Sequence, residues 1–177
     1  MTPVRVNRRT VLHGGALTVA AAAAPAAFAQ DSPAAGADGS FVYEVTRSED
    51  DWRSLLSEPE FNILRMGETE FPFTSPYARN NTEGGYHCKG CGLKLFDSKW
   101  YSPQEIGFVF FEQSEPNAVL TGIHTADAYG QGEVGHFLEV HCRRCGGHLG
   151  HIVSIDHKVL YCINGTAMEL RPAKTTG

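Results

Sequence analysis

The spacing of apolar residues divides the chain into a short helical part and a longer part of strands. Ser48 followed by a run of acidic residues predicts a capped helix start, and Trp52 and Leu55 lie after it at helical spacing. The segment Ser57–Pro59 predicts the start of a second short helix. The polar, glycine-containing stretch 112–135 predicts surface loops. Short apolar runs bounded by turns predict strands at 108–111, 137–140 and 159–164.

The first 29 residues carry the pattern of an export signal. Arg8-Arg9 precedes an alanine-rich run that ends in Ala27-Phe28-Ala29, an A-x-A-like cleavage site. A membrane-spanning helix is the alternative, but this run is shorter than the roughly 20 apolar residues that a span needs, and Pro25 interrupts it. We therefore expect residues 1–29 to be a twin-arginine export signal that directs the protein to the periplasm.

A linker and one domain are expected to follow the signal. Residues 30–44 are rich in alanine, glycine, serine and aspartate, which is typical of a flexible linker, and residues 45–174 are enough for one domain with its own core. Removing the signal takes away three arginines and no acidic residue, so the formal net charge falls from −5 to −8. This charge argues against nucleic acid as a partner. No segment after the signal is apolar enough to predict stable membrane insertion.

The cysteines carry most of the chemical information. Cys88 and Cys91 form one C-x-x-C pair, Cys142 and Cys145 form a second, and the two surrounding segments resemble one another at an offset of 54 residues. Four thiolates at this spacing suit one tetrahedral, structural Zn2+. Disulfides are the alternative in an exported protein, but five cysteines leave at least one thiol unpaired. We predict a zinc site that joins distant parts of a sheet structure.

Cys162 is the cysteine left over. In a strand over 159–164, alternate side chains point to opposite faces of the sheet. A thiol and a carboxamide on the face away from the core suit a reactive site, although a free cysteine also occurs as a small buried hydrophobe. The predicted core face holds Val159, Tyr161 and Ile163, and the other face holds Leu160, Cys162 and Asn164.

Two histidines shortly before Cys162 are candidates for proton transfer. His148 and His151 have side chains that titrate near neutrality, which suits a proton donor and a positioning group beside a thiolate. Two alternatives remain open at this point, a structural role and binding of a second metal ion. Three further histidines are expected to be ordinary surface residues: His124, His136 and His157.

Several segments occur in an order that a known family shares: Arg65–Glu70, Tyr86–Gly92, Leu95–Ser98, Cys142–His151 and Tyr161–Asn164. From about Asp51 to Pro172 the chain resembles the type B methionine sulfoxide reductases, which repair oxidised methionine by reducing methionine-R-sulfoxide. The resemblance implies a mainly β fold, with two antiparallel sheets stapled by the zinc site and short N-terminal helices.

The resemblance also implies the chemistry. It implies Zn2+ on the four paired cysteines and Cys162 as the nucleophile, with His148, His151 and Asn164 around the sulfoxide oxygen and the attacking thiol. Methionine sulfoxide, in proteins or free, would be the substrate. Cys162 would become a sulfenic acid, which an external, thioredoxin-like thiol reductant would reduce.

The chain departs from the family pattern where the substrate is recognised. The segment Gly107–Phe111 replaces the family's G-W-P-S-F, so Phe108 and Phe110 become the candidate pocket residues. Phe108 supplies an apolar wall but lacks the indole N–H of a tryptophan. Leu160 stands where many members have arginine, and Ile155 stands where an acid is usual. Ile106 occupies the position of a resolving cysteine, so reduction of the sulfenic acid needs an outside thiol.

These departures leave three functions to distinguish. The first is an exported methionine-R-sulfoxide reductase. The second is a reductase of another sulfoxide that suits a more aromatic, less polar pocket. The third is a zinc-stapled binding module without turnover, which the altered pocket favours and the retained Cys162, His148, His151 and Asn164 oppose.

Overall fold

The computed structural model describes residues 40–79, 82–127 and 134–173. The expected export signal, residues 1–29, lies outside the described residues, as does the first part of the expected linker. Among the described residues, none of the helices has the length and apolar character needed to cross a bilayer. The described end of the linker contacts Arg144, which lies between the two cysteines of the second pair: Glu44 Oε2 is 3.3 Å from Arg144 Nε.

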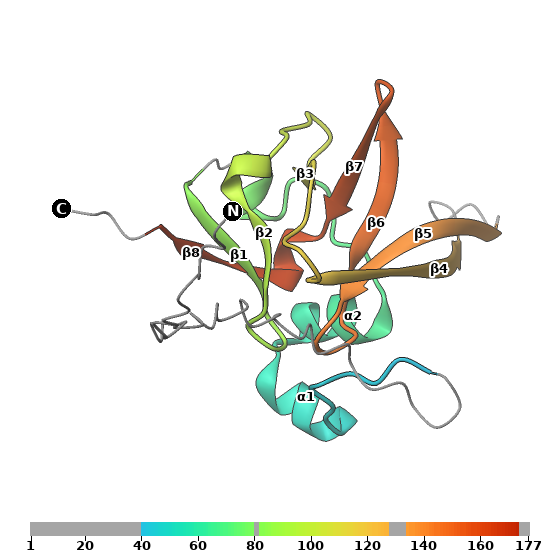
Figure 1. Ribbon diagram of the computed structural model, residues 1–177. Coiled ribbons are helices and arrows are strands. Elements are labelled where there is room, and N and C mark those ends of the chain that lie inside the picture. Colours follow the sequence, from blue (N-terminus) through green and yellow to red (C-terminus); the bar gives the residue numbers. More distant parts are fainter. Residues whose placement is uncertain (1–39, 80–81, 128–133, 174–177) are drawn as a thin grey trace, which may run out of the picture. The chain divides into compact units, whose positions relative to one another are not determined.

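Both predicted helices are present and begin at the predicted caps (Figure 1). In α1 (Glu49–Leu55), the hydroxyl of Ser48 accepts a hydrogen bond from the backbone N–H of Asp51 at 3.2 Å. In α2 (Glu58–Met66), the backbone N–H of Ser57 donates to the Glu60 carboxylate at 2.9 Å. Gly67 ends α2 in the left-handed conformation, with φ of 75°. The two helices bury Trp52, Phe61, Ile63 and Leu64.

The strands form two antiparallel sheets, which confirms the predicted mainly β fold. The small sheet has the order β2-β1-β8, and the large sheet has the order β3-β7-β6-β5-β4 (Figure 1). The strands of the small sheet are β1 (Gly84–Cys88), β2 (Lys94–Asp97) and β8 (Met168–Pro172). Those of the large sheet are β3 (Val109–Phe111), β4 (Val119–Asp127), β5 (Val134–Cys142), β6 (His148–Ile155) and β7 (Lys158–Ile163).

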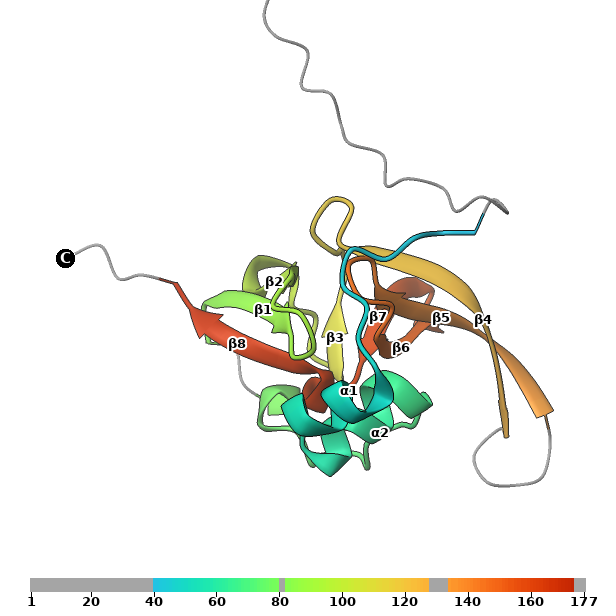
Figure 2. The ribbon, with the colours of Figure 1, turned by 90° about the horizontal axis from the view of Figure 1, so that it is seen from below.

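The stretch 112–135 differs from its prediction. It was expected to form surface loops, but much of its described part is β4, which pairs along its whole length with β5. Figure 2 shows the β4–β5 hairpin reaching away from the small sheet. Many of its side chains are exposed, including Ile123 and Leu138, so the apolar alternation that marks a half-buried strand is weak.

The core lies between the two sheets and is aromatic. Phe111 in β3 stacks on Phe96 in β2 with ring centroids 4.4 Å apart, and its ring edge meets Tyr86 of β1 at 5.0 Å. The predicted faces of β7 need correction at one end. Val159 was expected in the core but is 68% exposed, whereas Leu160 is 1% exposed. Strand β7 therefore has buried residues on both faces near its C-terminal end, at Leu160 and Ile163, whereas Val159 near its start is exposed.

Candidate active site and metal centre

Two turns bring the four paired cysteines together. Cys88 ends β1 and Cys142 ends β5, and each is followed by a turn that carries the second cysteine of its pair. The turns are built alike: the carbonyl of Cys88 accepts from Gly92 N–H, and that of Cys142 accepts from Gly146 N–H, both at 2.8 Å. Gly92 and Gly146 have positive φ, of 74° and 68°. The repeat in the sequence is therefore a repeat in backbone structure.

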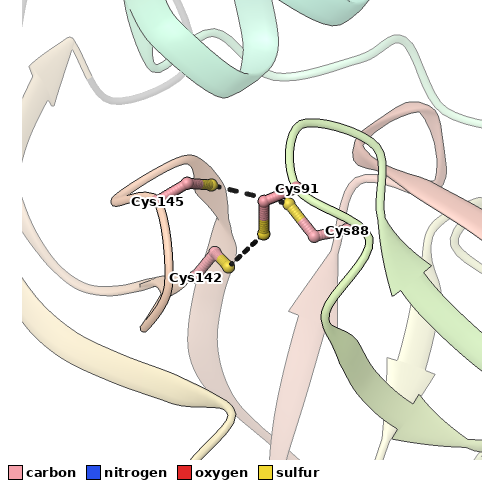
Figure 3. Close-up of side chains that lie close together, drawn as sticks. All are labelled: Cys88, Cys91, Cys142 and Cys145. Atoms are coloured by element: carbon pink, nitrogen blue, oxygen red, sulfur yellow. Dashed lines mark hydrogen bonds between the residues drawn. The ribbon is translucent and has the colours of Figure 1, made fainter. Parts of the chain in front are cut away.

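The sulfur atoms of these cysteines point toward one another from the two sheets (Figure 3). Cys88 Sγ lies 3.8 Å from Cys145 Sγ, and Cys91 Sγ lies 3.5 Å from Cys142 Sγ. A disulfide would place two sulfurs about 2.05 Å apart. Four sulfurs bound tetrahedrally at about 2.3 Å from a zinc ion are about 3.8 Å apart. This four-cysteine centre therefore has the spacing of a metal site, and all four thiols are free.

Cys162 lies in the middle of the large sheet. It pairs with Phe110 of β3 on one side and with His151 of β6 on the other. His151 pairs in turn with Glu139 of β5. Residues directly opposite one another in antiparallel strands project to the same face. Cys162, His151 and Glu139 therefore share one face, which we call the site face.

A β-bulge brings His148 to the same face. Val140 pairs with Gly150 and His141 pairs with His148, so two residues of β6 advance against one of β5. This extra residue reverses the alternation and turns His148 toward Glu139. His148 Nδ1 lies 2.7 Å from Glu139 Oε1, whereas His148 Nε2 is buried without a hydrogen-bond partner in the described structure.

His124 completes the group of imidazoles, whereas it was expected to be an ordinary surface residue. It lies in β4, opposite Phe137 of β5, and its Nδ1 is 3.0 Å from His151 Nε2. The sequence did not place it in the site, because β4 was not predicted as a strand and nothing fixed the register of β4 on β5. Glu139 was missed although its strand was predicted in part, because the sequence did not fix the register of β5 on β6. It projects to the site face only because β5 pairs with β6 at this register.

Burial sets the acidity of these groups. It raises the pKa of the Cys162 thiol to about 12, with the nearby Glu70 carboxylate adding to the effect. Burial lowers the pKa of His151 to about 4, with further lowering from His148 and His124. The pKa of His148 is also lowered, chiefly by burial, although Glu139 opposes the shift. At neutral pH the site therefore holds a neutral thiol at Cys162 and neutral imidazoles at His148 and His151.

Asn164 is held by the backbone on both ends of its amide. Its Oδ1 accepts from the Glu70 backbone N–H at 3.1 Å, and its Nδ2 donates to the Leu149 carbonyl at 3.0 Å. The Glu70 carboxylate accepts hydrogen bonds from the backbone N–H groups of Gly165 and Thr166 at 2.8 and 2.9 Å. The turn that follows Cys162 is therefore fixed by a network that also includes the segment after α2.

A cavity of about 680 Å³ joins four of the predicted site residues. Cys162, His151 and Asn164 line it, and Phe108 and Phe137 give it aromatic walls. His148 is 4% exposed and Phe110 is fully buried, and neither lines the cavity. The roles predicted for these residues stay predictions.

Residues 56–172 match the model of the SelR domain. Two bacterial proteins named peptide methionine sulfoxide reductase MsrB are similar over nearly their whole length. The Azotobacter vinelandii protein is 36% identical over 132 residues, which cover 73% of this chain and 96% of the relative. The Pseudomonas aeruginosa PAO1 protein is 34% identical over 136 residues, which cover 75% and 98%.

A longer plant protein is also similar. Peptide methionine sulfoxide reductase B3, chloroplastic, of Oryza sativa subsp. japonica is 33% identical over 136 residues, which cover 73% of this chain but only 55% of the plant protein.

Proposed function

Because this chain belongs to the type B methionine sulfoxide reductase family, we propose that it reduces methionine-R-sulfoxide, in proteins or free, to methionine. One observation carries the proposal: Cys162, the cysteine outside the four-cysteine centre, opens into an aromatic cavity beside His151. A nucleophilic thiol next to an imidazole is what attack on a sulfoxide sulfur requires. Phe108 and Phe137 offer an apolar surface for the methyl group on that sulfur.

The reaction balances with the groups at hand. The Cys162 sulfur attacks the sulfoxide sulfur while the thiol proton passes through an imidazole to the sulfoxide oxygen. This attack forms a sulfur–sulfur bond and leaves a hydroxyl on the substrate sulfur. The hydroxyl then moves to the Cys162 sulfur while the sulfur–sulfur bond breaks, so methionine leaves as a thioether and Cys162 becomes a sulfenic acid. Sulfur is reduced in the substrate and oxidised in Cys162. Because burial keeps the resting thiol protonated, Cys162 itself brings the proton that the oxygen needs.

Regeneration of the thiol requires an outside reductant. The other four cysteines of the chain belong to the four-cysteine centre, so none remains to form a disulfide with Cys162. A first external thiol condenses with the sulfenic acid, releasing water and leaving a mixed disulfide. A second thiol then reduces that disulfide and frees Cys162. A thioredoxin-like dithiol supplies both thiols in one molecule.

We propose Zn2+ for the four-cysteine centre, with a structural role. Four thiolates fill the coordination sphere of a tetrahedral zinc ion and leave no position for substrate. The sulfur spacing fits this ion, and the centre joins β1 of the small sheet to β5 of the large sheet.

We further propose export to the periplasm by the twin-arginine route. The support is the sequence pattern of residues 1–29, with Arg8-Arg9 before the apolar run. Replacing Arg8-Arg9 by Lys-Lys should stop export. Full periplasmic recovery of that variant would contradict the route.

The activity is tested with the separate R and S isomers of a methionine sulfoxide peptide and excess dithiothreitol. We expect reduction of the R isomer only, and its loss in Cys162→Ser. Turnover of neither isomer by folded, zinc-loaded protein would contradict the proposal. It would favour another sulfoxide as substrate or a binding module.

A further inference from the structure

The three imidazoles on the site face form a nearly equilateral triangle. Ring centroids of His124 and His148 are 5.3 Å apart, those of His124 and His151 are 5.3 Å apart, and those of His148 and His151 are 5.2 Å apart. Each ring offers a nitrogen within 4.8 Å of the other two. The rings come from β4 and β6, which lie on either side of β5 (Figure 1).

One nitrogen of these imidazoles lacks a hydrogen-bond partner. His148 is 4% exposed, and its Nε2 has no hydrogen-bond partner in the described structure. Its Nδ1 lies 2.7 Å from a carboxylate oxygen of Glu139, so Nδ1 carries the proton and donates it. Nε2 is then an unprotonated, buried lone pair. A carboxylate behind the far nitrogen of a histidine is the usual arrangement for a histidine that binds a metal ion.

The nitrogens of His124 and His151 already lie close to the spacing of two ligands on one metal ion, and each of the three rings has a nitrogen within 4.8 Å of the other two. Three nitrogens bound at about 2.0–2.1 Å to a tetrahedral ion are about 3.3 Å apart. His124 Nδ1 and His151 Nε2 are 3.0 Å apart, so they need to separate by only a few tenths of an ångström. A simple hydrogen-bonded cluster explains that pair, but it leaves His148 Nε2 without a partner. A metal ion would satisfy all three nitrogens.

We infer that His124, His148 and His151 form a second metal site, for a divalent late first-row transition metal such as Zn2+. Imidazole nitrogens suit these ions, and three of them leave a fourth position open for water or a thiolate. His124 and His151 line the cavity that Cys162 also lines, so the ion lies beside the nucleophile. Bound metal withholds the imidazoles from proton transfer, a consequence that rests on the proposed function.

The test is a Zn2+ titration of the full mature protein whose four-cysteine centre is already filled. Equilibrium dialysis should find a second Zn2+ per chain in the wild type. His124→Ala should weaken the second site at least tenfold. His136→Ala is the matched control, because His136 is an exposed histidine on the same hairpin; this variant should bind like the wild type. Binding of no second ion, or equal loss in both variants, would overturn the inference.

Glu139→Gln tests the carboxylate behind His148. It should lower the affinity for the second Zn2+ by about tenfold to a hundredfold, as loss of such partners does elsewhere. Unchanged affinity would show that His148 is not a ligand. Circular dichroism and the zinc content of the four-cysteine centre establish that each variant is folded, so weak binding is not mistaken for unfolding.

An activity measurement separates this inference from the proposed function. Added Zn2+ should inhibit the wild type reversibly, with a chelator restoring turnover, and should not lower the activity that His124→Ala retains. Equal inhibition of both proteins would overturn the inhibitory consequence. If the wild type binds a second ion but reduces neither isomer without it, the metal site stands and the proposed function fails.

Discussion

At the scale of single residues, the site combines a thiol that resists ionisation with imidazoles that resist protonation. Burial produces both effects, since it disfavours the thiolate of Cys162 and the imidazolium of His151 alike. Without substrate, Cys162 is therefore a protonated thiol and not a thiolate. Proton transfer and attack are expected to occur together, once the sulfoxide offers an oxygen to receive the proton.

The raised pKa of Cys162 predicts how alkylation depends on pH. Only the thiolate reacts with iodoacetamide, and the pKa is about 12. The rate constant at Cys162 should therefore rise about tenfold per pH unit from pH 7.5 to 9.5. An ordinary thiol with a pKa of about 8.5 would level off in this range. Mass spectrometry locates the label. A plateau below pH 9 would contradict the shift.

Replacing Asn164 is expected to lower the stability of the protein as well as its activity. Asn164→Ala removes the acceptor for the Glu70 N–H and the donor to the Leu149 carbonyl, both in a buried network. The free energy of unfolding should fall by about 2–3 kcal/mol, as measured by urea denaturation. Gln104→Ala, which removes one half-buried hydrogen bond at 3.3 Å to the Ser102 carbonyl, is the control and should cost less than about 1 kcal/mol. Equal costs would contradict this role.

Only some of the site residues could be predicted from the sequence. Cys162 was identified by its separation from the paired cysteines, and His148 and His151 by their place near it. His124 and Glu139 were not, because strand register and the bulge between β5 and β6 decide that they face the same side. Register is set by the hydrophobic pattern of the paired strands and by turn geometry, and the exposed side chains of the β4–β5 hairpin, such as Ile123 and Leu138, weaken that pattern.

At the scale of secondary-structure elements, close backbone contact between β6 and β7 holds Cys162 in place. Gly150 pairs with Ile163, and a Cβ atom at Gly150 would overlap the carbonyl oxygen of Cys162. Helix caps made α1 and α2 predictable from local sequence, whereas β4 carries too little apolar alternation. The strands around the site depend on such contacts between segments.

Gly150→Ala should therefore separate β6 from β7. We expect the free energy of unfolding to fall by about 3 kcal/mol or more, at the upper end for single substitutions, with loss of most activity. Gly122→Ala is the matched control in β4, where the added Cβ would meet the Glu139 carboxylate at 3.5 Å and the His141 ring at 3.7 Å, both ordinary van der Waals distances. The control should stay within about 1 kcal/mol of the wild type. Urea denaturation of both variants checks this, and equal stabilities would contradict it.

At the scale of the whole molecule, the four-cysteine centre lies where the two sheets and α2 meet. Cys88 and Cys91 come from the small sheet, and Cys142 and Cys145 come from the large sheet (Figure 3). Helix α2 touches both turns. Arg65 Nη1 donates to the Cys145 carbonyl at 3.1 Å, and Glu60 forms a 3.0 Å ion pair with Lys89. This joining of distant segments could be predicted from the sequence, because the ligands of a zinc site are recognised by their residue type and spacing.

Loss of one cysteine from this centre should therefore weaken the whole fold. Cys88→Ser leaves three thiolates and a buried hydroxyl, and binding energy of a structural zinc ion is folding energy. The melting temperature should fall by at least about 10 °C, together with the zinc content. Cys162→Ser is the control: its thiol lies outside the centre, so it should keep its zinc and melt within a few degrees of the wild type while losing activity. If Cys88→Ser melts with the wild type, the sheets hold together without the metal, and the centre has another role.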